Sequence, residues 1–169
     1  MTNKILLTLL TGLTFYVNNA GAQSLIAKNA PSKTTSRNAV AEGPDVWGVF
    51  DGRVRCQEMA VVMKATVPGN CEKLKWSFTF YQHPTTHEPT TYVLRGSLFR
   101  DQPRKGKWIL TKGTHDDPNA TVIQLDPDHS DTSLFLLKGD DNVLFILNGN
   151  KELMVGDTYL SYTFNRTIN

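Results

Sequence analysis

The 169-residue sequence lacks the signatures of most enzymes and of membrane-spanning helices. It contains no Gly-x-Ser-x-Gly elbow, no His-Glu-x-x-His pair and no phosphate-binding glycine loop, so the common hydrolase, metalloprotease and nucleotide-dependent chemistries have no motif to support them. Beyond the N-terminus, no stretch approaches the roughly 18 uninterrupted apolar residues of a membrane-spanning helix. We therefore expect a protein that is not an enzyme.

A charge imbalance is also missing from the part of the chain that is expected to fold. The whole chain has 18 Lys and Arg against 16 Asp and Glu, but residues 46–169 hold 14 of each. A neutral domain has little of the long-range attraction that draws proteins to phosphate backbones. Nucleic acid is therefore not an expected partner.

The N-terminus has the pattern of an export signal. Lys4 precedes the apolar run Ile5 to Val17, and Ala20-Gly21-Ala22 supplies the small residues of a cleavage site. These features predict a signal peptide over residues 1–22 and a periplasmic or secreted protein. Because no Cys lies near the expected cleavage point, no lipid anchor to the membrane is expected.

Cysteine is scarce, with only Cys56 and Cys71 in the whole chain. In an oxidising compartment, two cysteines in one small domain usually pair, which predicts a Cys56–Cys71 disulfide. A bridge that closes about fifteen residues contributes on the order of 3 kcal/mol by restricting the unfolded chain. A domain of this length needs no metal or cofactor merely to fold.

The rest of the chain divides into a polar leader and one folded domain. Residues 23–45 are rich in Ser, Thr, Asn, Ala and Lys and are predicted to be disordered, and residues 46–169 form the domain. Within the domain, β-branched and aromatic runs alternate with Gly, Asp, Asn and Pro clusters, and no segment keeps a helical period. The candidate strands are Val46 to Val54, Met59 to Thr66, Lys75 to Gln82, Thr91 to Phe99, Lys107 to Thr111, Thr121 to Leu125, Ser133 to Leu137, Val143 to Leu147 and Tyr159 to Phe164.

This pattern predicts an all-β fold, a small antiparallel lipocalin-like β-barrel of about eight strands, with a sandwich as the alternative. Large apolar residues alternate with more polar ones between Lys75 and Gln82. Trp76, Phe78 and Phe80 are therefore expected inside the barrel.

Several short motifs follow one another along the domain. They are Cys56-x-x-Met59 after the first strand, Thr91-Tyr92-Val93-Leu94-Arg95, Gly106-Lys107-Trp108, Val122-Ile123-Gln124-Leu125, Leu144 to Leu153 and Thr158 to Tyr162. This order resembles the N-terminal domain of the NlpE-type copper resistance lipoproteins, in which the first strand leads to a Cys-x-x-Cys. The resemblance implies a lipocalin-like barrel of the bacterial envelope that handles copper or senses envelope stress. The chain departs from the family at Met59, which replaces the second Cys, and in lacking the lipidated N-terminal Cys.

A soft-metal site is the sharpest chemical hypothesis for this tract. Cys56, Met59 and Met63 offer thiolate and thioether sulfur, which suit Cu(I). A disulfide to Cys71 would remove the thiolate, and the two-residue period of a strand would place both methionines in the core. Copper is thus a candidate ligand of these residues, and the alternative is that they serve only the packing and cross-linking of the fold.

Two imidazoles, His83 and His87, lie in a loop bracketed by Pro84 and Pro89. Imidazole binds copper and zinc, so both residues are candidates for a metal site. The prolines disfavour the helix that would place both rings on one face, so a solvated turn is the alternative.

These observations predict a binding or sensing module of the NlpE-like type, monomeric and without a required cofactor. Its candidate partners are a copper ion, a small apolar ligand and an envelope protein. A lipocalin-like carrier of a small apolar molecule is one alternative, because barrels of about eight strands can hold one ligand. A structural or inhibitor domain that binds another protein is the other.

Overall fold

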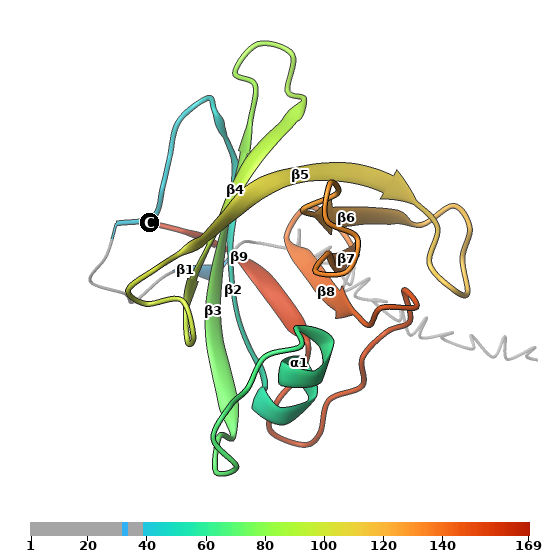
Figure 1. Ribbon diagram of the computed structural model, residues 1–169. Helices are drawn as coiled ribbons and strands as arrows, with labels where there is room; N and C mark the ends of the chain where they lie inside the picture. The colour runs from blue at the N-terminus through green and yellow to red at the C-terminus, as the bar shows by residue number, and fades with distance from the viewer. Residues whose placement is uncertain (1–31, 34–38) are drawn as a thin grey trace, which may run out of the picture.

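The computed structural model describes residues 32–33 and 39–169, which are almost entirely β-strands and turns (Figure 1). The strands are β1 (Ser32–Lys33), β2 (Val46–Arg55), β3 (Lys73–Gln82), β4 (Pro89–Gly96), β5 (Arg104–Lys112), β6 (Thr121–Leu125), β7 (Leu134–Lys138), β8 (Val143–Leu147) and β9 (Thr163–Ile168). The one helix among the described residues is α1 (Cys56–Val62). The predicted all-β fold with an antiparallel barrel of eight strands is confirmed.

Strands β2 to β9 form an antiparallel sheet that closes on itself. From β2 to β8, each strand pairs with the next along the chain, and β9 then pairs with both β8 and β2. Strand β5 serves two sides of the barrel, because Arg104 to Lys107 pair with β4 and Trp108 to Lys112 pair with β6. The closure excludes the alternative sandwich.

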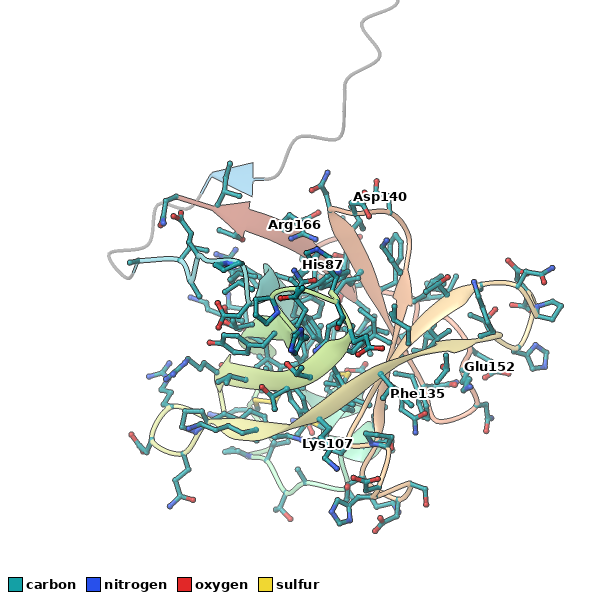
Figure 2. The ribbon with its side chains drawn as sticks, turned by 90° about the horizontal axis from the view of Figure 1, so that it is seen from above. His87, Lys107, Phe135, Asp140, Glu152 and Arg166 are labelled. Atoms are coloured by element: carbon teal, nitrogen blue, oxygen red, sulfur yellow. A yellow bond between two sulfur atoms is a disulfide. The ribbon has the colours of Figure 1, made fainter. Side chains whose placement is uncertain are left out.

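Large apolar side chains fill the barrel interior, as Figure 2 shows from above. In β3, Trp76 is 2% exposed and Phe78 and Phe80 are 0% exposed, so all three lie inside as predicted. Their rings contact one another and those of Phe50 and Phe164 at centroid distances of 5.0–6.2 Å. Burying one such ring contributes about 1.5–3 kcal/mol, so this aromatic column is a main source of the stability of the fold.

The strand predicted over Met59 to Thr66 is wrong, because the chain forms helix α1 from Cys56 to Val62. Gln, Glu, Met and Ala at positions 57–60 favour a helix, and the buried residues Cys56, Met59 and Ala60 repeat at helical spacing. Val61, which a strand would have placed beside Met59, is 79% exposed. Seven residues are too short for a clear helical period, and the apolar run resembled a strand.

Of the other predicted strands, only β6 and β8 have the predicted bounds, and the last strand differs most. The last strand was predicted over Tyr159 to Phe164 but begins at Thr163, because Asp157 forms a turn before it. The Asp157 carboxylate accepts hydrogen bonds from the backbone N–H groups of Tyr159 and Leu160, at 2.8 Å each. The strand predicted over Thr91 to Phe99 ends at Gly96.

The segment before β2 lies along the barrel where the structure describes it. β1 pairs in parallel with β9, and the backbone N–H of Val40 donates to the Asn169 side chain at 2.9 Å. The predicted signal peptide and most of the predicted leader lie outside the described residues. Among the residues described, no helix has the length and apolarity that crossing a bilayer requires.

Candidate functional site

The predicted disulfide is present and joins the start of α1 to the segment before β3. Cys56 and Cys71 are bonded, with their Cα atoms 5.7 Å apart, and no free cysteine occurs in the described chain. Cys56 is fully buried in the core, and its backbone N–H donates to the carbonyl of Glu72 at 3.1 Å. The bridge therefore fixes the helix against the barrel.

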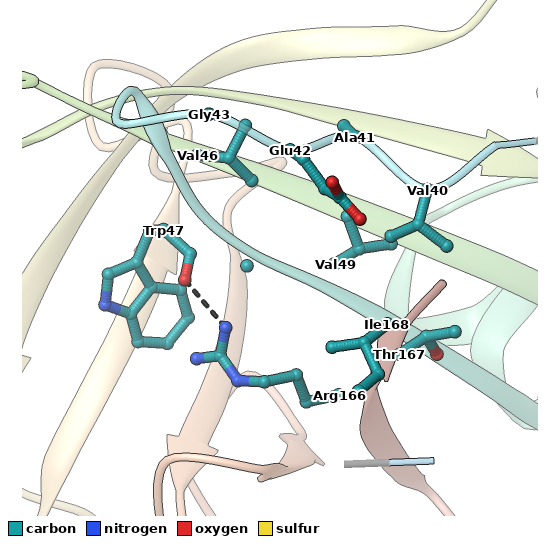
Figure 3. Close-up of a pocket in the computed structure, with 11 residues that line it drawn as sticks. Val40, Ala41, Glu42, Gly43, Val46, Trp47, Val49, Arg166, Thr167 and Ile168 are labelled. Carbon is teal, nitrogen blue, oxygen red and sulfur yellow. Dashed lines mark hydrogen bonds between the residues drawn. The ribbon is translucent and has the colours of Figure 1, made fainter. Parts of the chain in front are cut away.

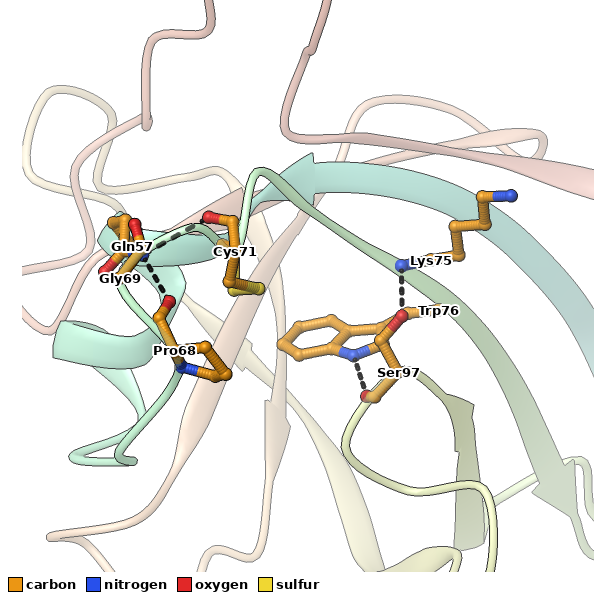
Figure 4. Close-up of a disulfide and its surroundings, with 8 residues drawn as sticks. Gln57, Pro68, Gly69, Cys71, Lys75, Trp76 and Ser97 are labelled. Atoms are coloured by element: carbon orange, nitrogen blue, oxygen red, sulfur yellow. Dashed lines mark hydrogen bonds between the residues drawn. A yellow bond between two sulfur atoms is a disulfide. The ribbon is translucent and has the colours of Figure 1, made fainter.

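Gln57 adds a second tie between α1 and the same segment, as Figure 4 shows. Its side-chain amide points at the carbonyls of Pro68, Gly69 and Cys71, at 3.0, 3.2 and 3.3 Å. Residues 64–72 are thus held on the helix by one covalent and several polar contacts. Helix α1 lies at the end of the barrel where β2 finishes and β3 begins (Figure 1).

The sulfur atoms proposed as copper ligands are used for packing. Cys56 is in the disulfide, so it has no thiolate to offer, and Met59 is 0% exposed within the core. Met63 follows one helical turn after Met59 and packs against the same core. No group of three His, Cys, Asp or Glu in the described part of the chain is arranged to hold a metal ion.

The two candidate histidines, His83 and His87, are exposed in the hairpin between β3 and β4. The Nδ1 atom of His83 accepts from the backbone N–H groups of Thr85 and Thr86 at 3.3 and 3.2 Å, and the backbone N–H of His87 donates to the His83 carbonyl at 2.9 Å. These contacts order the turn internally. The structure therefore brings His83 and His87 into one loop but not to the sulfur atoms of the other candidates.

At the end of the barrel opposite helix α1, Arg166 covers the aromatic core. Its guanidinium carbon lies 4.6 Å from the ring centroid of Phe50 and 5.1 Å from that of Trp47. Nη1 donates to the Trp47 carbonyl at 2.7 Å and Nε to the Asp141 carbonyl at 2.6 Å. Burial lowers the pKa of Arg166 from its usual value, and the nearby Asp141 opposes this shift. The guanidinium thus lies over the rings of Trp47 and Phe50.

A cavity of about 220 Å³ lies beside Arg166 (Figure 3). It is bounded by residues 40–43, by 46–49 of β2 and by 166–168 of β9. Ligand pockets for molecules of drug size usually measure about 300–1,000 Å³. This hollow lies between the N-terminal segment and strands β2 and β9, and it is smaller than that range.

A buried polar network joins three parts of the barrel near the start of β5, and sequence analysis missed it. The Tyr92 hydroxyl donates to Asp126 Oδ2 at 2.7 Å, and Arg104 donates to the same oxygen through Nη2 at 2.7 Å. Arg104 also donates through Nε to the Tyr92 hydroxyl at 2.9 Å and through Nη2 to the Thr132 carbonyl at 2.6 Å. The Arg104 and Asp126 side chains are only 17% and 13% exposed.

The chemistry of this network is structural. Burial, followed by the hydrogen bond to Asp126, raises the pKa of Tyr92 above its usual 10.0, so the phenol stays neutral. The carboxylate of Asp126 is occupied by both partners and is not available as a base. The network ties β4 and β5 to the turn after β6, which an exposed ion pair between Lys107 of β5 and Asp128, at 3.1 Å, also joins to the barrel.

Gly106 leaves space for this network, and it is the one feature of the sequence from which the network could have been predicted. Gly106 lies opposite Tyr92 in the register of β4 and β5. A Cβ atom on Gly106 would lie 1.8 Å from Asp126 Oδ1 and 3.1 Å from the Tyr92 ring. A glycine inside a strand often marks such a close approach, so the Gly106-x-Trp108 motif had a structural meaning.

No protein-family model, no characterised protein sequence and no solved structure matches this chain.

Proposed function

We propose that the chain is an exported, NlpE-like binding or sensing module that acts through its outer surface and not through a ligand held inside the barrel. The observation that carries the proposal is the filled interior: Phe50, Phe78, Phe80, Tyr92 and Leu94 are all 0% exposed. A carrier of an apolar molecule needs empty volume at this position.

Both ends of the barrel support the same conclusion. At one end, the Cys56–Cys71 disulfide and the buried Met59 hold α1 in place. At the other, Arg166 lies over Trp47 and Phe50. A ligand that entered at either end would have to displace these packed side chains.

The NlpE-like assignment is supported by where its motifs fall on the barrel. The Cys56-x-x-Met59 tract follows β2 directly, as the family pattern expects of its first strand, and Gly106-x-Trp108 lies within β5. The copper role implied by that resemblance would require reduction of the disulfide, because Cys56 must be a thiolate to bind the metal.

Two titrations of the oxidised protein test the proposal. The first uses Cu(I) held by a competing chelator, and the second uses a fluorescent fatty acid. We expect neither to give a saturable one-to-one complex. A fatty-acid complex that is lost on replacing Phe78 by Trp would favour the carrier, and a Cu(I) complex that is lost in a Met59→Leu variant would favour the metal site.

A further inference from the structure

The formal charges of this neutral domain are divided between its two halves. Residues 46–112 hold 11 Lys and Arg against 5 Asp and Glu, whereas residues 113–169 hold 3 against 9. The first range covers β2 to β5 and the second β6 to β9. Strands β2 to β4 lie on one side of the barrel and β6 to β8 on the other, with β5 and β9 joining the two sides (Figure 1). The barrel is therefore strongly dipolar although its net charge is close to zero.

Strand pairing gathers cations on the outer face of β2 to β5. In β3 the inward Leu74 and Trp76 are buried, so Lys73 and Lys75 point outward and are exposed. Five outward cations of this kind have no carboxylate within 4.0 Å among the described residues, and we call them the basic wall: Arg53, Lys73, Lys75, Arg95 and Lys105.

The arrangement of the basic wall is unfavourable for the protein alone. Arg53 lies directly opposite Lys75 in the register of β2 and β3, and like charges directly opposite one another destabilise a sheet. Arg95 lies opposite Ser77, on the next strand along the same face. Neutralisation by an external anionic partner would relieve this repulsion.

An apolar side chain stands beside the basic wall in a fixed position. Leu98, in the turn after β4, is 46% exposed and has a φ of 73°, a left-handed conformation that leucine rarely adopts. Ser97 anchors the turn: its N–H donates to the Lys75 carbonyl at 2.9 Å, its hydroxyl accepts from the Lys75 N–H at 3.0 Å, and its carbonyl accepts from Trp76 Nε1 at 2.9 Å (Figure 4).

We infer that the basic wall and Leu98 bind an anionic lipid bilayer surface. This inference rests on the proposed function, because it names a partner for the outer surface. Cations spread over several strands match a surface of many lipid phosphates, and the exposed leucine in the neighbouring turn matches the acyl boundary beneath the headgroups. The outward positions between the cations are Asp51, Ser77, Thr79 and Val93, none of which is aromatic, so stacking of nucleic acid bases has no platform there.

Vesicle co-sedimentation of the exported protein at low ionic strength tests the inference. The vesicles contain phosphatidylcholine alone or phosphatidylcholine mixed with the anionic lipid phosphatidylglycerol, which gives the bilayer a negative surface potential. We expect binding only to the anionic vesicles, with an Arg53→Gln/Lys75→Gln variant weakened roughly 25-fold, about fivefold per cation. A Leu98→Ser variant should bind about threefold more weakly and lose most of its binding in salt.

A matched control separates the basic wall from net charge. The Lys112→Gln/Lys151→Gln variant removes the same charge from the end of β5 and from the β8–β9 loop, and we expect it to bind like the unmodified protein. Because residues 1–45 are the same in all variants, any contribution from them cancels. Thermal unfolding monitored by circular dichroism checks that each variant is folded.

Four results would overturn the inference. They are no binding to anionic vesicles, equal weakening by the two double variants, full competition by inorganic phosphate at the lipid phosphate concentration and matched ionic strength, and a salt-sensitive dimer that accounts for the sedimentation. If the first occurs while the Cu(I) and fatty-acid titrations stay negative, the lipid partner is wrong and the proposed function stands. A saturable Cu(I) or fatty-acid complex would overturn the proposed function whatever the vesicles show.

Discussion

Replacing Tyr92 by Phe tests whether the buried network stabilises the fold. The change removes one hydroxyl, which donates to Asp126 at 2.7 Å and accepts from Arg104 at 2.9 Å. Hydrogen bonds to charged groups contribute about 1.5–3 kcal/mol each. Since Arg104 keeps its own bond to Asp126, we expect a loss near the lower end, about 1.5–2 kcal/mol, in urea unfolding at pH 7.

Tyr162 provides the matched control for this measurement. Tyr162 is 3% exposed, which is close to the 0% of Tyr92. Unlike the Tyr92 hydroxyl, the Tyr162 hydroxyl makes no hydrogen bond within the described structure. Tyr162→Phe should therefore change stability by less than about 0.5 kcal/mol. Equal effects of the two substitutions at pH 7 would refute the argument that the network is stabilising.

Alkaline titration gives a second readout of the same change. The pKa of Tyr92 is raised in the folded state, so its stabilising contribution is complete below the unfolded pKa near 10 and is lost as the pH rises above it. The unmodified protein should lose about 1.4 kcal/mol relative to Tyr92→Phe between pH 9 and pH 11. A stability difference that stays constant over this interval would contradict the burial of a neutral phenol.

Three further changes have expected outcomes in denaturant or thermal unfolding. Removing the disulfide with Cys56→Ala and Cys71→Ala should cost about 3 kcal/mol, and reduction of the unmodified protein should lower its midpoint similarly. Phe78→Ala should cost about 3–5 kcal/mol, because a fully buried ring leaves a cavity, and a cost below about 1 kcal/mol would show that the interior is not packed. Gly106→Ala should cost more than about 2 kcal/mol, because its Cβ would meet the Asp126 carboxylate, whereas Gly69→Ala, with open space around it, should cost less than about 0.5 kcal/mol.

The strands of the barrel could be predicted from the sequence because their side chains alternate between the solvent-exposed face and the buried face of the sheet. β6 and β8 have the predicted bounds, and Trp76, Phe78 and Phe80 point inward as their two-residue period requires. The disulfide followed from the expected compartment and the presence of only two cysteines.

The predictions that were wrong or missing concern features that depend on tertiary contacts more than on the local sequence pattern. Helix α1 has only seven residues, and its position depends on the bond from Cys56 to Cys71, fifteen residues later. The network of Tyr92, Arg104 and Asp126 brings together side chains 12 to 34 positions apart, which no local period reveals. The basic wall was hidden because a net charge sums over both halves of the barrel.

The closing strand of the barrel has a consequence for how the chain acquires its structure. β9 (Thr163–Ile168) is the last element, and it pairs with β2, whose residues lie more than 100 positions earlier. A chain that has not yet emerged beyond residue 162 would present two open sheet edges and could not cover its aromatic interior. The domain therefore completes its folding only after residues 163–168 have been synthesised, late and through long-range contacts.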